Sequence, residues 1–198
     1  MRAPRTPSRP LLRLIAACTL AAPSCSTRPV RPPTTSSADA IVVHDFTHGL
    51  AGVRRANPTL ELSVTPDSDA GGEPVLTVDF PVASNDPAQR DVYFDVSNRD
   101  WSAGSAILLP IKSSEATRLS VSFMDRNHIV YTSWTDLSGS AWQMIRIPFS
   151  EIRPNPYFQP PDAKKGVPLD VSDVGTFGLA PQSPSSGRLT IGRIVVVK

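Results

Sequence analysis

The chain has 198 residues, of which 40% are hydrophobic, and this fits one modest globular domain better than two. Its formal net charge of +2 is the sum of two unlike parts. Residues 1–38 hold six arginines and no acidic residue, and residues 39–198 hold 14 basic and 18 acidic residues. An acidic domain is not expected to bind nucleic acid by charge. Both cysteines, Cys18 and Cys25, lie in the first part, so the rest has no thiol nucleophile and no cysteine metal ligand.

The N-terminal residues have the three-part layout of a bacterial export signal. Four arginines precede an apolar stretch at residues 14–22, and small residues follow it. Cys25 resembles the lipid-modified cysteine of bacterial lipoproteins, and Cys18 is the alternative. We therefore expect an export signal at residues 1–25 and a Pro/Ser/Thr-rich linker at residues 26–38. The protein is then expected in the periplasm or at the cell surface, lipid-anchored or otherwise secreted.

From residue 39 onwards, hydrophobic residues recur at every second position in short runs that turn-forming residues separate. Such alternation is typical of β-strands with one buried face. We expect strands around residues 41–46, 60–64, 76–80, 92–96, 107–111, 119–123, 128–134, 145–149, 176–180 and 189–194. About ten short strands without a long helix predict one all-β domain at residues 39–198, an antiparallel β-sandwich or jelly roll.

A succession of short motifs runs through this part of the chain. Its most specific piece is the stretch Trp142-Gln-Met-Ile-Arg-Ile-Pro-Phe-Ser150; the others are Asp45-Phe46, residues 74–80, Asp100-Trp101-Ser102 and residues 119–125. In this order they resemble the galactose-binding-like jelly-roll modules, which include the carbohydrate-binding modules of family eleven and the related domain of complex I intermediate-associated proteins. The resemblance covers nearly all of residues 41–198.

The resemblance implies that one sheet binds sugars through aromatic rings and polar side chains. Tyr93 is the first candidate, because alternation with Val92 and Phe94 places it on the polar face of its strand; the alternative is that it only covers outer surface. Tyr131 and Trp134 are an odd number of residues apart, so only one can share that face, and we rank Tyr131 first. The expected glycan-binding residues are Asp91, Tyr93, Asp95, Tyr131 and Arg146, with Trp134 ranked after Tyr131.

Other aromatic and charged residues have competing interpretations. Arg146 either donates hydrogen bonds to a ligand or is an ordinary solvated arginine. Trp101 and Trp142 are assigned to packing, and the exposed-loop pair Tyr157-Phe158 either borders the binding surface or closes one end of the core.

The resemblance also implies a structural calcium site. In many relatives, an acidic residue near the first strand and an aspartate in the last strand hold this ion. Asp45 offers the first of these, but the second position holds Gly192 or Arg193, so we expect no metal and no cofactor. A glycosidase needs two carboxyl groups flanking one bond. Asp91 and Asp95 lie about 13 Å apart along their strand, which is beyond the usual separation, and no Gly-x-Ser-x-Gly motif is present.

The sequence therefore favours a monomeric, non-catalytic glycan-binding domain of an exported protein. One alternative is an interaction lipoprotein that docks another envelope protein, which predicts a flat apolar patch. A polysaccharide-active enzyme ranks third.

Overall fold

The structure is a computed structural model that describes residues 40–80, 90–96, 100–163, 166–182 and 186–198. The expected export signal, the linker and both candidate lipidation sites, Cys25 and Cys18, lie outside the described residues. Within these residues, no helix combines the length and the apolar character needed to cross a bilayer.

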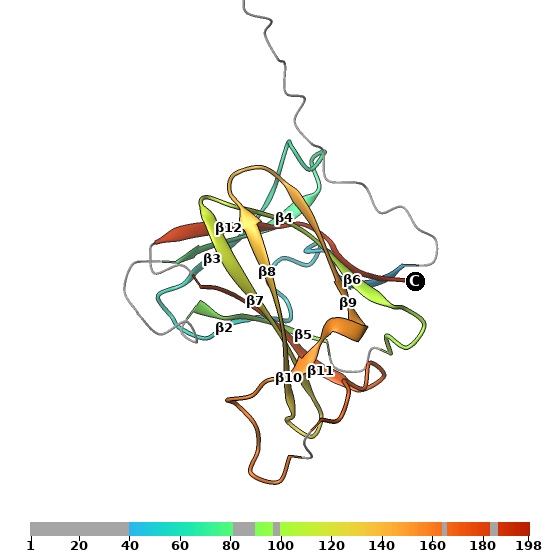
Figure 1. Ribbon diagram of the computed structural model, residues 1–198. Coiled ribbons are helices and arrows are strands. Elements are labelled where there is room, and N and C mark those ends of the chain that lie inside the picture. The colour runs from blue at the N-terminus through green and yellow to red at the C-terminus, as the bar shows by residue number, and fades with distance from the viewer. Residues whose placement is uncertain (1–39, 81–89, 97–99, 164–165, 183–185) are drawn as a thin grey trace, which may run out of the picture.

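Two antiparallel sheets pack against each other and confirm the predicted all-β sandwich (Figure 1). Sheet A has seven strands, with β9 pairing with β6 at one side of the path β1-β13-β6-β12-β4-β3. Its strands are β1 (Ile41–His44), β3 (Glu61–Pro66), β4 (Pro74–Phe80), β6 (Ala106–Ser113), β9 (Gln143–Pro148), β12 (Gly187–Ile191) and β13 (Ile194–Val197).

Sheet B has six strands, in the order β10-β8-β7-β11-β5-β2. These are β2 (Val53–Arg55), β5 (Val92–Asp95), β7 (Ala116–Asp125), β8 (Val130–Ser138), β10 (Arg153–Pro154) and β11 (Val174–Pro181). A short 3-10 helix, η2 (Phe149–Glu151), leads from β9 of sheet A to β10 of sheet B. The chain therefore crosses between the sheets just after the Trp142-to-Ser150 stretch.

The sequence predicted most of these strands, with differences at the C-terminus and at the edges of sheet B. The single closing strand expected around residues 189–194 is two strands, β12 and β13, which follow one another along the same side of β6. Gly192 lies at the break and donates its backbone N–H to the carbonyl of Pro110 at 2.8 Å. The edge strands β2 and β10 were not predicted, because two or three residues are too short to show an alternating pattern.

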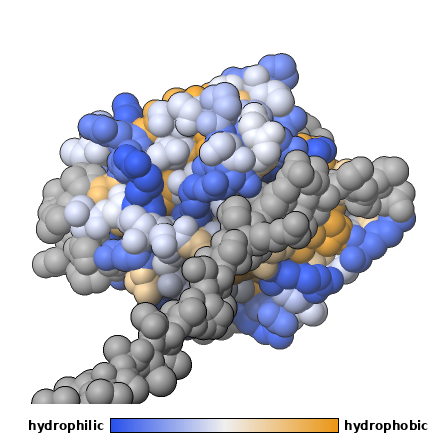
Figure 2. Space-filling view, turned by 90° about the horizontal axis from the view of Figure 1, so that it is seen from above, coloured by the Kyte–Doolittle hydropathy of each residue, from blue (hydrophilic) through white to orange (hydrophobic). Residues whose placement is uncertain are grey.

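The core between the sheets is built from the inward side chains of both, and aromatic rings form its centre. Phe177 lies between Phe94 and Phe123, with ring centroids 5.4 and 5.5 Å away. Trp101 is fully buried, stacked on Phe149 and edge-on to Phe123, which confirms its assignment to packing. Seen from above, hydrophobic residues show only in small areas of the surface (Figure 2).

A second, smaller cluster lies on part of the outer face of sheet A. Trp142 packs there with Ala70 and Val75, as its assignment to packing predicts. The ammonium group of Lys112 lies 4.9 Å from the centre of the Trp142 ring and 2.8 Å from a carboxylate oxygen of Asp67. Asp67 also accepts the backbone N–H of Asp69 at 2.7 Å. The turn between β3 and β4 is thereby fixed over Trp142.

The Asp67 carboxylate gives this turn a predicted pH dependence. Burial alone would raise the pKa of Asp67, but the hydrogen bond from Lys112 and two backbone N–H bonds outweigh it and lower the pKa below its usual value. Its ionised form therefore stabilises the fold above pH about 4, and this contribution is lost as the pH falls through the lowered pKa.

We expect Asp67→Asn, which keeps an acceptor for the backbone but removes the charge, to cost about 1 kcal/mol at neutral pH. Denaturant unfolding at several pH values measures this, and the difference from the wild type should shrink below pH about 4. A difference that stays constant into acid would contradict the role of the charge.

Candidate functional site

The outer face of sheet B gathers four of the six residues that the sequence singled out. Val92 and Phe94 of β5 point into the core, so Tyr93 and Asp95 point outward, together with Asp91 just before the strand. Trp134 of β8 lies on the same face and is 47% exposed. The structure therefore brings Asp91, Tyr93, Asp95 and Trp134 together on one surface.

Small side chains lie between the two aromatic residues. Gly178 of β11 pairs with Tyr93 on one side and with Ser122 of β7 on the other. One row further along, Ser120 pairs with both Ala180 and Trp134. Because β11 and β7 separate β5 from β8, these two strands lie about 14 Å apart, at roughly 4.8 Å per strand, and Trp134 is also shifted by one row along the sheet relative to Tyr93. We call Gly178, Ala180, Ser120 and Ser122 the small-residue floor.

Tyr93 lies across this floor and is held by its hydroxyl group. A Cβ atom added to Gly178 would come within 3.0 Å of Tyr93 Cδ1, so the ring passes directly over the glycine. The Tyr93 hydroxyl donates a hydrogen bond to Asp91 Oδ2 at 3.0 Å. Burial and the Asp91 carboxylate raise the pKa of Tyr93, so the phenol stays protonated. The ring is thus fixed in place with its oxygen still able to accept a hydrogen bond.

Trp134 stands at the other side of the floor, beside Arg118 of β7. The Arg118 guanidinium carbon lies 5.0 Å from the centre of the Trp134 ring, which is a cation–π distance. About half of the indole remains in contact with solvent. Its exposed surface is apolar and flat, which suits the apolar face of a sugar ring.

The ranking of Tyr131 ahead of Trp134 was wrong. Tyr131 pairs with Phe123 and shares its inward face, so it is only 1% exposed and belongs to the core. Its hydroxyl donates a 3.4 Å hydrogen bond to the carbonyl of Pro168. The odd spacing did place Tyr131 and Trp134 on opposite faces, but sequence alone did not show which face was buried.

Arg146 also lies apart from the other candidates. It belongs to β9, at one side of sheet A, where it pairs with Leu108 and donates a 3.3 Å hydrogen bond to the Ser105 hydroxyl. The side chain is exposed, as alternation with Ile145 and Ile147 predicts. It does not join the outer face of sheet B, because strand alternation carries no information about which sheet a strand enters.

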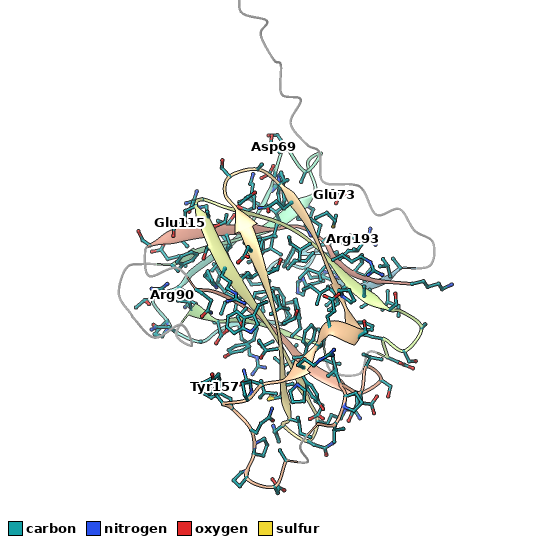
Figure 3. The ribbon with its side chains drawn as sticks, in the orientation of Figure 1. Asp69, Glu73, Arg90, Glu115, Tyr157 and Arg193 are labelled. Carbon is teal, nitrogen blue, oxygen red and sulfur yellow. The ribbon has the colours of Figure 1, made fainter. Side chains whose placement is uncertain are left out.

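The loop after β10 presents two further aromatic side chains beside sheet B. Tyr157 is 85% and Phe158 66% exposed, which rules out that they close the core. The Asn155 side chain accepts both of their backbone N–H groups and donates to the Thr132 hydroxyl at 2.8 Å. Figure 3 shows Tyr157 in the lower part of the molecule, away from Asp69 and Glu73 at the upper end. The loop is therefore anchored to β8 while its rings face solvent.

The surroundings of Asp45 do not fit a calcium ion. One oxygen of its carboxylate accepts the backbone N–H and the hydroxyl of Thr47, at 3.1 and 2.8 Å. Burial alone would raise the pKa of Asp45, but these bonds and the nearby charges of His44 and Arg193 lower it. Arg193 thus brings a positive charge close to Asp45, which opposes a divalent cation. Among the described residues, no three His, Cys, Asp or Glu side chains gather as metal ligands would.

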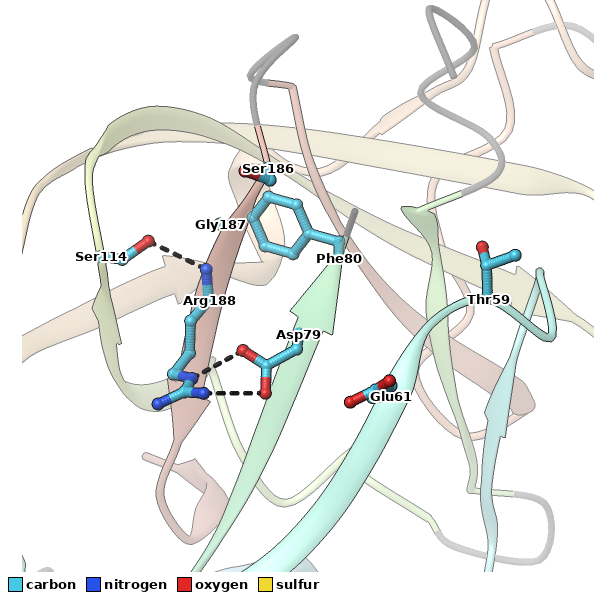
Figure 4. A pocket seen from close by; sticks show the side chains of 8 residues that line it. All are labelled: Thr59, Glu61, Asp79, Phe80, Ser114, Ser186, Gly187 and Arg188. Carbon is cyan, nitrogen blue, oxygen red and sulfur yellow. Dashed lines mark hydrogen bonds and ion pairs between the residues drawn. The ribbon is translucent and has the colours of Figure 1, made fainter. Parts of the chain in front are cut away.

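A cavity of about 490 Å³ lies elsewhere, at the end of β3, β4 and β12 in sheet A (Figure 4). Arg188 in its wall donates to both carboxylate oxygens of Asp79, at 2.6 and 3.0 Å, and its backbone N–H donates to the Ser114 hydroxyl. Glu61 stands on the neighbouring strand β3, directly opposite Asp79. The charged groups of Arg188 and Asp79 therefore largely satisfy each other.

Comparisons with known proteins agree with the fold. The model of the carbohydrate-binding domain of family 11 matches residues 28–197. A family 11 module from Clostridium thermocellum, solved with a β-1,3-1,4-mixed-linked tetrasaccharide, is 19% identical with a TM-score of 0.61, over 82% of this chain and 97% of that one. A family 30 module of a cellulosomal cellulase from the same organism is 14% identical with a TM-score of 0.57, over 80% and 97% of the two chains.

The same fold also matches a part of a larger enzyme. An exo-β-agarase is 17% identical with a TM-score of 0.55, over 79% of this chain and 25% of that chain. No curated protein sequence matches the chain. The family match covers most of the sequence and confirms the resemblance that its motifs indicated: the protein belongs to the carbohydrate-binding domains of family 11.

Proposed function

We propose that the outer face of sheet B binds a glycan chain without catalysis. The observation that carries this proposal is the placement of Tyr93 and Trp134 on one face, on either side of the small-residue floor. Pyranose rings pack their apolar faces on aromatic rings. Between the two aromatics, Ser120 and Ser122 are partly exposed, whereas Gly178 and Ala180 are buried beneath the surface. Asp91, Asp95 and the floor serines supply polar groups for the sugar hydroxyls.

The non-catalytic assignment agrees with the family, whose domains are binding modules. The C. thermocellum module was solved with a β-1,3-1,4-mixed-linked tetrasaccharide. Mixed-linkage β-glucan is a neutral polymer with these linkages, so it is the first one to try. The four outward-facing candidates and the loop aromatics Tyr157 and Phe158 form the surface that we expect to contact it.

The test is affinity electrophoresis or calorimetry of the full chain with mixed-linkage β-glucan. We expect Tyr93→Ala and Trp134→Ala each to weaken binding about tenfold, because each removes one stacking platform. Tyr131→Phe is the matched control, since it alters a core tyrosine on the same sheet and should leave binding unchanged. Absence of binding to a panel of neutral and acidic glycans, or full binding by the double alanine variant, would remove the proposed site.

We further propose that the domain is exported and tethered to the cell envelope by lipid at Cys25, with Cys18 as the alternative. The arginine-rich start, the apolar stretch at residues 14–22 and the linker at residues 26–38 support this. Fatty-acid labelling and mass spectrometry of the mature N-terminus test it, and an unlipidated start at Ser26 or later would exclude the anchor. Pull-down from envelope extracts tests the alternative of a protein partner.

A further inference from the structure

Arg118 differs from other arginines of the domain in what its guanidinium contacts. In the described part of the chain, no hydrogen bond or ion pair of the Arg118 side chain is found, and its contact is the face of Trp134. Other arginine side chains donate to carboxylates or backbone carbonyls: Arg188 to Asp79, Arg126 to Asp173, Arg55 to Leu60 and Arg153 to Ile152. No protein group among the described residues therefore takes up the Arg118 donors, which face solvent.

The neighbouring carboxylate makes no ion pair with this guanidinium. Asp136 of β8 stands directly opposite Arg118 in the strand register, yet the described structure records no ion pair between them. Stacking on Trp134 instead holds the guanidinium over the ring. A guanidinium in this position keeps the N–H groups around its own edge available to an acceptor.

The other aromatic of the site also has a cation beside it. Arg54 of β2 pairs with Tyr93 in the sheet and is exposed, and its charge acts on the Tyr93 hydroxyl. A cation therefore stands next to each aromatic residue of the outer face, together with the carboxylates of Asp91, Asp95 and Asp136. Beside Trp134, the guanidinium of Arg118 makes no bond to a described residue, so it offers two donors to an anionic group of a ligand that also carries sugar rings.

We infer that Arg118 and Trp134 form a subsite for an acidic sugar, in which the sugar packs on the exposed indole and its carboxylate accepts two hydrogen bonds from the guanidinium. A carboxylate is the acceptor that the guanidinium fork matches in a bidentate manner. This inference rests on the proposed function, since it names the ligand class of the same surface. The ligand class is a glycan that contains uronic acid residues.

The experiment compares binding of the full chain to polygalacturonate and to mixed-linkage β-glucan. We expect Arg118→Gln to weaken binding to polygalacturonate about tenfold and to change binding to the neutral glucan less than about twofold. Arg118→Lys should restore only part of the loss, because lysine lacks the fork. Raising the salt from about 0.02 to 0.3 M should weaken polygalacturonate binding only.

Arg146→Gln is the matched control, because it removes the same charge from an exposed arginine on sheet A. It should leave binding to both polymers unchanged, and thermal unfolding verifies that every variant is folded. Binding of the neutral glucan alone, or equal loss from Arg118→Gln and Arg146→Gln, overturns the acidic subsite while the proposed function stands. Binding of neither polymer counts against both.

Discussion

Gly178→Val is expected to weaken glycan binding at least about thirtyfold, the largest effect of any single change in the proposed site. A Cβ atom at this position would overlap Ser122 Oγ and come within 3.0 Å of the Tyr93 ring, so the valine has no room while Tyr93 stays in place. The ring must tilt away from the floor, which disrupts one stacking platform, and the branched side chain fills the space beside it. Titration with the polymer that the wild type binds measures the loss.

The control for this change tests its steric cause. Gly178→Ala combined with Ser122→Ala removes the overlap with the Ser122 hydroxyl and should recover much of the affinity lost by Gly178→Ala alone. Near-ultraviolet circular dichroism should report the moved Tyr93 ring, while the unfolding transition should stay cooperative. Wild-type affinity in Gly178→Val would show that ligand does not approach the small-residue floor.

Trp101→Ala is expected to lower the free energy of unfolding by about 3–5 kcal/mol. The indole is fully buried, stacked on Phe149 at 6.3 Å between ring centroids and edge-on to Phe123 at 6.4 Å, so its removal leaves a large cavity in the core. For a domain of this size the midpoint of thermal unfolding should fall by roughly 6–20 °C. Calorimetry or denaturant titration measures this change.

Trp101→Phe separates packing from hydrogen bonding at the same position. The Trp101 Nε1 group is buried and has no hydrogen-bond partner among the described residues, so its N–H contributes no bond that phenylalanine would lose. We expect this variant to cost less than half as much as the alanine variant. Equal losses for the two would mean that a phenylalanine ring does not fill the space well enough to stabilise the core, contrary to this expectation.

Much of the fold was predictable because the strands bury one face each. The alternation of Leu76, Val78 and Phe80, and of Leu119, Val121 and Phe123, determined both the strands and their inward faces. These runs lie in central strands, where the inward side chains must be apolar for packing. The edge strands of sheet B, β2 and β10, are only two or three residues long. They are too short to show an alternating pattern and were missed for that reason.

The site was only partly predictable, because its residues come from strands far apart in sequence. Alternation within β5 gave the outward direction of Tyr93 correctly, since its neighbours are strongly apolar. In β8 the pattern gave no such guidance: Val130 and Thr132 flank Tyr131, and only the pairing of Tyr131 with Phe123 reveals its inward face. Strand pairing likewise separates Arg146 from the site and brings Arg118 to Trp134, which no local pattern signals.

The shortness of β2 and β10 affects how the protein behaves at high local concentration. Among the described residues, these two strands are the edges of sheet B, and Pro154 removes one of the two backbone donors of β10. A short edge interrupted by proline offers a poor template for another chain to extend the sheet. Many copies crowded on one surface are therefore expected to remain separate molecules, each presenting the same face of sheet B to solvent.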